Sequence, residues 1–361
     1  MNFTTESVRH LLTQIIDPNT GKDIVSDHAV RHIDVQDHQI QIDIALAYPG
    51  RSQLEPLRAH IIALLKSSGA TKVEVSVNLN ITAHAVPVGT KRLPEVKNII
   101  AVASGKGGVG KSTCAVNLAL ALAAEGAQVG ILDADIYGPS IPTLLGVTGP
   151  PKAIDEHSMQ PLLGHGLQTN SIGFLVPPDS PMVWRGPMVT QALEQLLRQT
   201  QWQGLDYLIV DMPPGTGDIQ LTLAQRVPVT GAIIVTTPQD LALIDARKGL
   251  KMFEKVGVPI LGVIENMSLH KCSHCGHTEP IFGTGGGQRI SQDYGVTLLG
   301  SLPLDINIRE QADLGKPTVI SAPDSQNAQA YIQIARKAAI QIAQLHQDMS
   351  HKFPKIVVQN T

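Results

Sequence analysis

The first part of the chain alternates between two hydrophobic periods, one typical of helices and one typical of strands. Apolar residues recur at helical spacing over 7–16 and 54–65, and alternate with polar residues over 40–46 and 73–79. A shorter stretch over 30–35 predicts a further strand, and Asp17-Pro18 and Pro49-Gly50 mark element ends. We therefore expect a small α+β domain over 1–85, which is an ordinary size for a domain.

A different pattern begins after 86–97, a segment with the composition of a linker. Continuous apolar runs, typical of buried parallel strands, occupy 98–104, 129–132, 207–210, 232–236, 260–264 and 297–299. Helical periodicity is found over 114–124, 189–199, 241–256 and 327–345. This alternation predicts an α/β fold over 98–361, with a mostly parallel, doubly wound sheet covered by helices on both faces.

A phosphate-binding loop lies between the run over 98–104 and the helical stretch over 114–124. The segment Gly105-Lys106-Gly107-Gly108-Val109-Gly110-Lys111-Ser112-Thr113 fits the pattern G-x-x-x-x-G-K-[ST]. Its glycines allow successive backbone N–H groups to surround a phosphate, and the following helix N-terminus adds partial positive charge. Strand, loop and helix together disfavour a chance glycine-rich turn, so the sequence predicts a P-loop NTPase sheet that binds a nucleoside triphosphate.

Polar residues follow two other predicted strands at their carboxyl ends, where such sheets bind ligands. Asp133 and Asp135 come after 129–132, and two carboxylates facing a triphosphate can orient a water or reach a magnesium ion. For Asp133 a purely loop-structuring role is an equal alternative. Asp211 ends the strand over 207–210 in a Walker B position, which serves Mg²⁺ directly or through water. Gly215 offers a backbone N–H toward the γ-phosphate.

The residues that follow the strand over 260–264 indicate which nucleotide base the site would bind. Asn266 stands there, but a guanine-specific N-K-x-D pattern is absent because position 269 is Leu. ATP is therefore favoured over GTP. The alternative for Asn266 is a simple turn residue, since asparagine is common in turns.

Cys272 and Cys275 form a C-x-x-C pair that can place two thiolates on one soft metal site. Two cysteines cannot complete a tetrahedral site, but a two-fold dimer would supply four thiolates, enough for one iron–sulfur cluster. The main alternative is zinc, with a third ligand from one of the nearby histidines (His270, His274 or His277), although these lack the usual long spacer. A thioredoxin-like redox pair is disfavoured by Gly276 and Pro280.

Composition narrows the classes of protein further. The 361 residues are 43% hydrophobic and 3% aromatic with a net charge of −3, which argues against a broad nucleic-acid-binding surface. We expect no membrane association, because the chain has no long apolar run and its first residues lack signal-peptide features. Three cysteines are an odd number for a disulfide framework, so we expect a reducing, cytoplasmic environment and treat Cys114 as a packed small residue.

The loop contains a second lysine, Lys106, directly after its first glycine. A lysine there points away from its own phosphates unless another subunit brings a nucleotide opposite it; otherwise it is a solvated surface residue. The pattern K-G-G-x-G-K-[ST] resembles the deviant Walker A loop of a group of dimerising ATPases. Within that group, the chain from about residue 97 onward resembles the Mrp/ApbC iron–sulfur cluster carriers. The segments that carry this resemblance are the loop, 133–140, 211–218, 265–268, the cysteine pair and 281–287 (Ile-Phe-Gly-x-Gly-Gly-Gly).

The resemblance implies a set of roles and partners. It implies that Lys106, Lys111 and Asp135 are catalytic, with Asp135 positioning the attacking water, in a slow, Mg²⁺-dependent ATPase. By the same resemblance Ser112 and Asp211 serve Mg²⁺, and the nucleotide contacts 105–113, Gly215 and, at its adenine, Asn266. Cys272 and Cys275 would hold a labile cluster, expected to be [4Fe–4S], between the subunits of a homodimer. Partners would be apo iron–sulfur proteins and cluster scaffold proteins.

Three departures from relatives refine this expectation. The N-terminal unit is similar to a domain of iron–sulfur assembly factors, many stand-alone copies of which carry a cysteine after the central strand. Residues 48–53 contain none here, so this domain is not expected to bind a cluster. Nitrogenase iron protein takes its cluster cysteines from the switch segments, and 133–140 and 211–218 have none. Partition and division ATPases lack the C-x-x-C pair and act on DNA or membranes.

Overall fold

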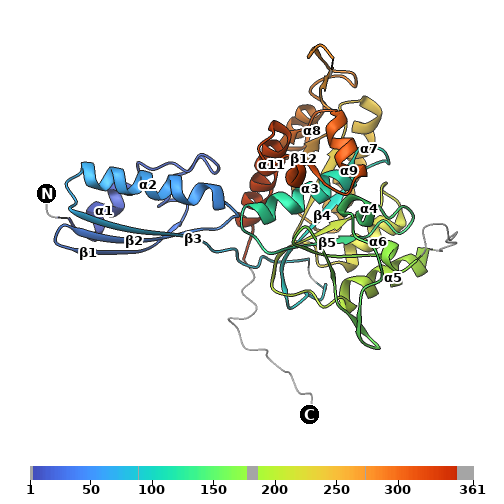
Figure 1. Ribbon diagram of the computed structural model, residues 1–361, viewed down its shortest axis with the longest axis horizontal. Coiled ribbons are helices and arrows are strands. Elements are labelled where there is room, and N and C mark those ends of the chain that lie inside the picture. Colours follow the sequence, from blue (N-terminus) through green and yellow to red (C-terminus); the bar gives the residue numbers. More distant parts are fainter. Residues whose placement is uncertain (1–2, 88, 177–185, 273, 348–361) are drawn as a thin grey trace.

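The computed structural model describes residues 3–87, 89–176, 186–272 and 274–347. Its first part is a three-stranded sheet with two helices, drawn in blue in Figure 1. The sheet order is β1-β2-β3, with an antiparallel β1–β2 pair and a parallel β2–β3 pair. The elements of this N-terminal domain are α1 (Thr5–Leu12), β1 (Val30–Gln36), β2 (Gln39–Leu46), α2 (Arg51–Ser67) and β3 (Lys72–Leu79).

The helix expected over 7–16 is shorter than predicted. It begins one residue after Thr4, which forms a capping box with Ser7, and it ends at Leu12. Ile15 is buried, but it reaches the core from a turn in which Ile16 forms a bridge to Asp23. Apolar spacing alone therefore overstated the length of this helix, because a turn can place a side chain in the core as a helix does.

The second part is an eight-stranded sheet in the order β15-β12-β11-β4-β10-β5-β9-β8. All neighbours are parallel except β8 and β9, so the expected mostly parallel sheet is confirmed and β8 is an antiparallel edge strand. The strands are β4 (Val96–Ala103), β5 (Val129–Asp133), β8 (Leu162–Gly164), β9 (Leu167–Ser171), β10 (Leu205–Asp211), β11 (Gly231–Thr236), β12 (Ile260–Glu265) and β15 (Leu298–Ser301).

Helices cover both faces of this sheet, as the sequence pattern predicted (Figure 1). The core on one face contains residues of α3 (Lys111–Ala124), α4 (Ile141–Leu145), α10 (Thr318–Ser321) and α11 (Gln326–Ala343), with α9 (Ile306–Asp313) packed on α4 and α10. The core on the other face contains residues of α5 (Gly186–Gln199), α6 (Asp218–Arg226), α7 (Asp240–Lys255) and α8 (Gly286–Tyr294).

Several short elements have no clear sequence signal. These are α4, α6, α8, α9, α10, the 3₁₀ helix η1 (Ile172–Phe174), the edge strand β8 with its neighbour β9, and two small hairpins, β6–β7 (Ala153–Asp155, Ser158–Met159) and β13–β14 (His270–Lys271, Thr278–Glu279). Each helix or strand among them is shorter than the window of about 11 residues that hydrophobic periodicity needs. The expected linker also differs slightly, because β4 begins at Val96, inside 86–97.

The two domains share a buried polar contact at the far end of α3. Glu125 follows α3 directly, and its carboxylate accepts hydrogen bonds from Ser52 Oγ at 3.0 Å and Arg336 Nη2 at 3.2 Å. Arg336 also donates to Asn19 Oδ1, and the Arg51 backbone N–H donates to the Glu125 carbonyl. The segment 48–53 therefore docks the N-terminal domain onto α3 and α11.

Candidate nucleotide site and cysteine pair

The phosphate loop runs from the end of the central strand β4 into α3. Gly110 is the N-cap of α3 and has a φ of 80°, a conformation that favours glycine. Gly105 is required for a different reason, because a Cβ there would lie 2.2 Å from the backbone carbon of Asp245 on α7. The loop is thus held between α3 and α7, with the α3 N-terminus directed at the predicted phosphate site.

Lys111 lies at the centre of a buried group of charges. Its ammonium is 2.6 Å from Asp211 Oδ1, 3.1 Å from Ser112 Oγ and 3.9 Å from Asp135 Oδ2. The sequence separation of these residues is large, and the adjacent parallel strands β5 and β10 bring their carboxyl ends together. The structure thus assembles four of the predicted site residues around one point.

The donor set around Asp211 fits a magnesium ion. Asp211 is fully buried, and its Oδ2 atom has no hydrogen-bond partner among the residues described. Ser112 Oγ and Asp211 Oδ1 both lie within 3.1 Å of the Lys111 ammonium, so the hydroxyl and the carboxylate are neighbours. Hard oxygen ligands of this kind are those that Mg²⁺ uses beside phosphates.

The two aspartates after β5 have different surroundings. Asp133 accepts hydrogen bonds from the backbone N–H groups of Ser140 and Ile141 and from Ser171 Oγ, at 2.9–3.1 Å. It therefore organises the loop that carries Asp135, and burial together with Asp211 raises the pKa of Asp133 to about 7. Burial also raises the pKa of Asp135, against the opposing effect of Lys111. Asp135 remains partly accessible at the mouth of the loop.

Asn266 and Gly215 lie at the phosphate loop, but each makes a bond that the sequence did not indicate. The Asn266 side-chain amide donates to the Val109 carbonyl at 2.8 Å, and its nitrogen occupies the space that a Gly110 side chain would need. The Gly215 backbone N–H donates to the Ser104 carbonyl at 2.9 Å. A contact of Gly215 with a γ-phosphate would have to replace that hydrogen bond.

Lys106 is partly exposed, and it makes no ion pair with another residue in the described part of the chain. By contrast, most lysines and arginines of α7 and α8 are paired. Helix α7 packs on the loop through Asp245, and it also carries Leu241 and Ile244, which are 72% and 47% exposed. Large exposed apolar side chains on a helix that contacts the phosphate loop are typical of a contact surface.

The cysteine pair lies on the β13–β14 hairpin, which projects beyond the helices at the top of Figure 1. Cys272 is partly exposed and Cys275 is exposed. Backbone N–H groups of Cys275 and His274 and the Cys275 thiol lower the pKa of Cys272 below its ordinary value. A lowered pKa favours the thiolate, which is the form that binds metals.

The third cysteine lies apart from this pair, and the described residues hold no group of three metal-binding side chains. Cys114 is buried in α3, and burial raises its pKa to about 12, as expected for a packed residue. Within 3–87, 89–176, 186–272 and 274–347, no three His, Cys, Asp or Glu side chains are grouped so as to hold a metal ion. The two cysteines of one chain thus stand as a pair on an accessible hairpin.

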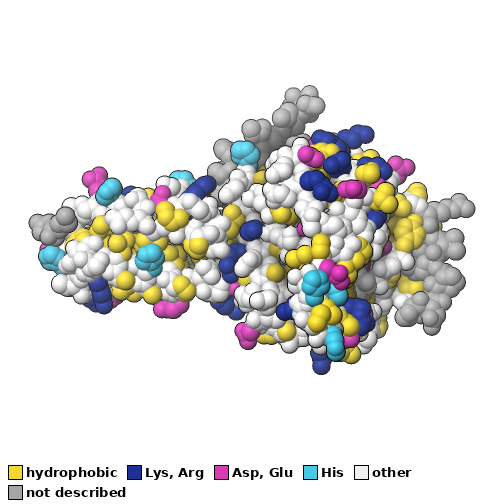
Figure 2. Space-filling model, turned by 90° about the horizontal axis from the view of Figure 1, so that it is seen from above, with side chains coloured by type: hydrophobic (Ala, Val, Ile, Leu, Met, Phe, Trp, Pro, Cys, Tyr) yellow, Lys and Arg dark blue, Asp and Glu magenta, His cyan; other side chains and the backbone are white. Residues whose placement is uncertain are grey.

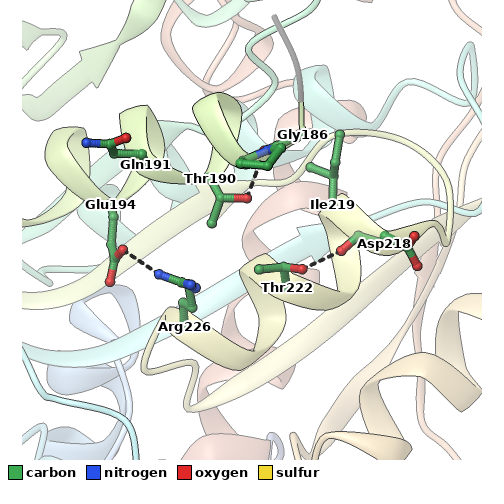
Figure 3. A pocket seen from close by; sticks show the side chains of 9 residues that line it. Gly186, Thr190, Gln191, Glu194, Asp218, Ile219, Thr222 and Arg226 are labelled. Carbon is green, nitrogen blue, oxygen red and sulfur yellow. Dashed lines mark hydrogen bonds and ion pairs between the residues drawn. The ribbon is translucent and has the colours of Figure 1, made fainter.

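A cavity of about 610 Å³, which no pattern in the sequence indicates, lies between α5 and α6. Figure 3 shows Thr190, Gln191 and Glu194 on one helix facing Asp218, Thr222 and Arg226 on the other. Glu194 and Arg226 form an ion pair at 2.9 Å, and both threonine hydroxyls donate to carbonyls of their own helices. The ion pair and the two hydroxyls of this cavity thus already have partners.

The fold and the loop define a P-loop NTPase, and comparisons with known proteins identify the family. Residues 95–339 match the family model described as "NUBPL iron-transfer P-loop NTPase", and residues 5–77 match that of an iron–sulfur cluster assembly protein. The "Iron-sulfur cluster carrier protein" of Escherichia coli is 52% identical over 343 residues, covering 94% of this chain and 90% of that protein. The chain belongs to the Mrp/ApbC/NUBPL family of iron–sulfur cluster carrier proteins.

Other relatives extend the comparison. The mouse "Iron-sulfur cluster transfer protein NUBPL" is 53% identical over 247 residues, which are 68% of this chain and 77% of that protein. A nucleotide-binding protein from Archaeoglobus fulgidus, solved with ADP, matches with a TM-score of 0.55 and 38% identity over 62% of this chain and 89% of its own. The Pyrococcus furiosus cell division ATPase MinD shares the fold, with a TM-score of 0.50, 23% identity, and 66% and 97% coverage. No helix among the described residues is long and apolar enough to cross a membrane.

Proposed function

We propose that this protein is an Mg²⁺-dependent ATPase that carries an iron–sulfur cluster between two copies of the chain and transfers it to apo-proteins. The observation that carries the proposal is the exposed Cys272–Cys275 pair, with its lowered Cys272 pKa, in a chain that also has a two-lysine phosphate loop. The carrier and transfer names of its relatives support the same function.

Hydrolysis would use the charges gathered at the carboxyl ends of β5 and β10. The loop N–H groups and the Lys111 ammonium would bind the β- and γ-phosphates, and Lys111 would exchange its contact with Asp211 for phosphate oxygens. Asp135 lies at the mouth of the loop and would orient the water that attacks the γ-phosphorus. The bond from that phosphorus to the β–γ bridging oxygen breaks, and ADP and inorganic phosphate leave.

Ser112 and Asp211 would hold the magnesium ion. The unpartnered Asp211 Oδ2 atom and the adjacent Ser112 hydroxyl support this assignment. When bound, Mg²⁺ neutralises charge on the phosphate oxygens. Asp133 would keep the loop that bears Asp135 in place through its three hydrogen bonds to Ser140, Ile141 and Ser171.

Two copies would meet at the face that carries the phosphate loops. Lys106, which has no ion pair among the residues described, would reach the nucleotide of the other copy. The exposed Leu241 and Ile244 of α7, the helix that packs on the loop, would supply apolar area to the contact. A two-fold arrangement would also bring two cysteine pairs together and provide the four thiolates that one cluster requires.

The proposal is tested by loading and transfer. The protein is reconstituted anaerobically with iron and sulfide, separated from free iron, and mixed with the apo form of a ferredoxin that has four cysteine ligands. We expect cluster absorption on the carrier and its transfer to the ferredoxin, with both lost in Cys272→Ser and in Cys275→Ser while ATP hydrolysis is kept. Wild-type protein that takes up no cluster, or a Cys272→Ser variant that transfers normally, contradicts the proposal.

A further inference from the structure

A second cavity, of about 490 Å³, adjoins the cysteine hairpin. We call it the hairpin cleft. One wall is the face of the hairpin that carries Leu269, Lys271 and Thr278, and the opposite wall is formed by α9, α10 and the first turn of α11. Lys271 directly precedes Cys272, so the cleft and the cysteine pair share the same two short strands. Its volume is within the range of ligand-binding clefts, about 300–1,000 Å³.

The charged side chains in the lining are one cation, Lys271, and one carboxylate, Asp305, so the lining matches a peptide better than an anion or a flat apolar partner. Most of its polar groups are uncharged amides and hydroxyls, contributed by α9, α10 and α11. The one carboxylate, Asp305, is already used, since it accepts hydrogen bonds from the Asn307 backbone N–H and from Asn327 Nδ2 at 2.8 and 2.9 Å. Amides and hydroxyls both donate and accept, as is required to pair with the alternating N–H and C=O groups of an extended segment.

One buried polar atom in the cleft wall lacks a partner. Thr318 is 5% exposed, and its Oγ1 atom makes no hydrogen bond with any residue in the described ranges. An unpaired buried hydroxyl costs free energy that a hydrogen-bonding ligand in the cleft could recover. The wall itself is fixed, because the neighbouring Val319 N–H donates to Asn117 Oδ1 on α3 at 3.1 Å.

Exposed apolar side chains lie on the elements that supply this polar lining. Leu269, Ile306 and Ile320 come from the hairpin, α9 and α10, the same elements that form the cleft, and each is more than 40% exposed. Figure 2 looks down on the end from which the hairpin projects and shows apolar, histidine and acidic side chains gathered there. Apolar residues grouped around a polar cleft are typical of a protein-binding surface.

We propose that the hairpin cleft binds an extended segment of the acceptor protein and thereby places the acceptor's cysteines beside Cys272 and Cys275. This inference rests on the proposed function. Transfer requires contact, since each exchange breaks one iron–sulfur bond to the carrier and forms one to an acceptor thiol. The acceptor thiol gives up its proton and the released carrier cysteine takes one up, so the oxidation state of the cluster is unchanged.

The test fills the cleft without touching either proposed centre. Ala322 is exposed and lines the cleft, so Ala322→Trp should obstruct it, and Ala153→Trp places the same side chain at an exposed site on β6 as the matched control. Transfer rates from the reconstituted carrier are measured against the concentration of the apo-ferredoxin. We expect Ala322→Trp to raise the half-saturating concentration about tenfold and to keep the maximal rate, as for loss of one strong interface contact. Ala153→Trp should match wild type.

A second variant and two further readouts separate the outcomes. Thr318→Val removes the unpaired hydroxyl at constant shape and should raise the same concentration severalfold, while cluster loss to a chelator is unchanged in both variants. Normal transfer kinetics in Ala322→Trp, with wild-type loading and transfer intact, overturns the docking site alone. If Ala322→Trp changes the proportion of dimer to monomer, the cleft belongs to the contact between copies, and this result also overturns the docking site. Wild-type protein that neither loads nor transfers a cluster contradicts the proposed function itself.

Discussion

Lys111 carries the largest share of the electrostatics at the candidate nucleotide site. It is almost fully buried and faces three oxygen-bearing side chains, Ser112, Asp135 and Asp211, of which Asp211 is completely buried. A cation in this position compensates the carboxylates before nucleotide binds and can stabilise phosphate charge afterwards. In the proposed mechanism one residue would therefore contribute to both stability and catalysis, and a variant must be assayed for both.

We predict that Lys111→Ala abolishes detectable ATP hydrolysis, because the charge that stabilises the transferred phosphoryl group is lost. The matched control is Lys97→Ala, which breaks an ion pair of 2.7 Å with Asp206 at the opposite end of β10. That variant should hydrolyse ATP at the wild-type rate. Phosphate release is measured after circular dichroism has shown that both variants are folded. ATP hydrolysis by Lys111→Ala would show that the phosphate loop does not take part in the reaction as proposed.

Cys272 and Cys114 differ in their protonation and access, and this gives a prediction for the metal-free protein. Hydrogen bonds hold the pKa of Cys272 below its ordinary value, whereas burial raises that of Cys114 to about 12. As pH rises, Cys272 should become a thiolate before Cys114 and be alkylated faster, and Cys114 should react only after unfolding. Mass spectrometry of iodoacetamide-treated protein over a pH series measures the order. Equal rates for Cys272 and Cys114 in the folded protein would contradict the structure.

At the scale of elements, α3 connects the phosphate loop to the N-terminal domain. Its first residue is Lys111, and Glu125 directly after its last turn is buried against Arg336 and Ser52. The N-terminal domain is thus attached to the far end of the helix whose beginning is the candidate phosphate site. The segment 48–53, which has no cysteine, contributes to this attachment.

Arg336→Ala should therefore destabilise the protein, since it leaves Glu125 buried without its cation. Arg336 and Glu125 are 11% and 6% exposed, so a loss of about 3 kcal/mol is expected for breaking this pair. Arg309→Ala is the control, because the Arg309–Asp313 pair is more than half exposed and should contribute about 0.5 kcal/mol or less. Urea unfolding measures both. Equal effects of the two substitutions would show that the interdomain contact is not formed in solution.

Much of the framework could be predicted from the sequence, because it depends on patterns that are local. The phosphate loop, the continuous apolar runs that became β4, β5, β10, β11 and β12, and the polar residues at their ends are all visible in short windows. The strand order and the number of strands could not be predicted, since β9 and the edge strand β8 are short and their pairing depends on distant residues. Element ends also shifted by a few residues where capping, rather than hydrophobicity, determines them.

For the candidate site residues, too, some positions could be predicted from the sequence and some contacts could not. Lys111, Ser112, Asp135 and Asp211 could be placed together because parallel strands carry their ends to one edge. The hydrogen bonds of Asn266 to Val109 and of Gly215 to Ser104 could not be predicted, because they depend on loop conformations with no periodic signal. The partnership of Glu125 with Arg336 joins residues 211 positions apart, and no pattern in the chain links them.

At the scale of the whole molecule, the proposed function requires two copies of the chain. Each chain has two accessible cysteines on its hairpin, Lys106 in its phosphate loop, and exposed apolar side chains on α7. In the proposed two-fold pair, the second copy would complete each of these features. ATP and cluster binding would then both depend on the same association.

Lys106→Ala tests that association at the nucleotide. The variant should bind ATP but lose hydrolysis, because the missing ammonium belongs to the other copy's site, and light scattering should show a weaker dimer. Lys248→Ala is the control, since Lys248 is an exposed lysine of α7 that pairs with Asp245. A Lys106→Ala variant that hydrolyses ATP normally would make Lys106 an ordinary surface residue.

The most direct test of the central claim is native mass spectrometry of the anaerobically reconstituted protein, combined with iron, sulfide and zinc analysis. We predict one iron–sulfur cluster per dimer, absent from monomers and from dimers of Cys272→Ser or Cys275→Ser. One zinc ion held by each monomer, unchanged when the dimer dissociates, would contradict it.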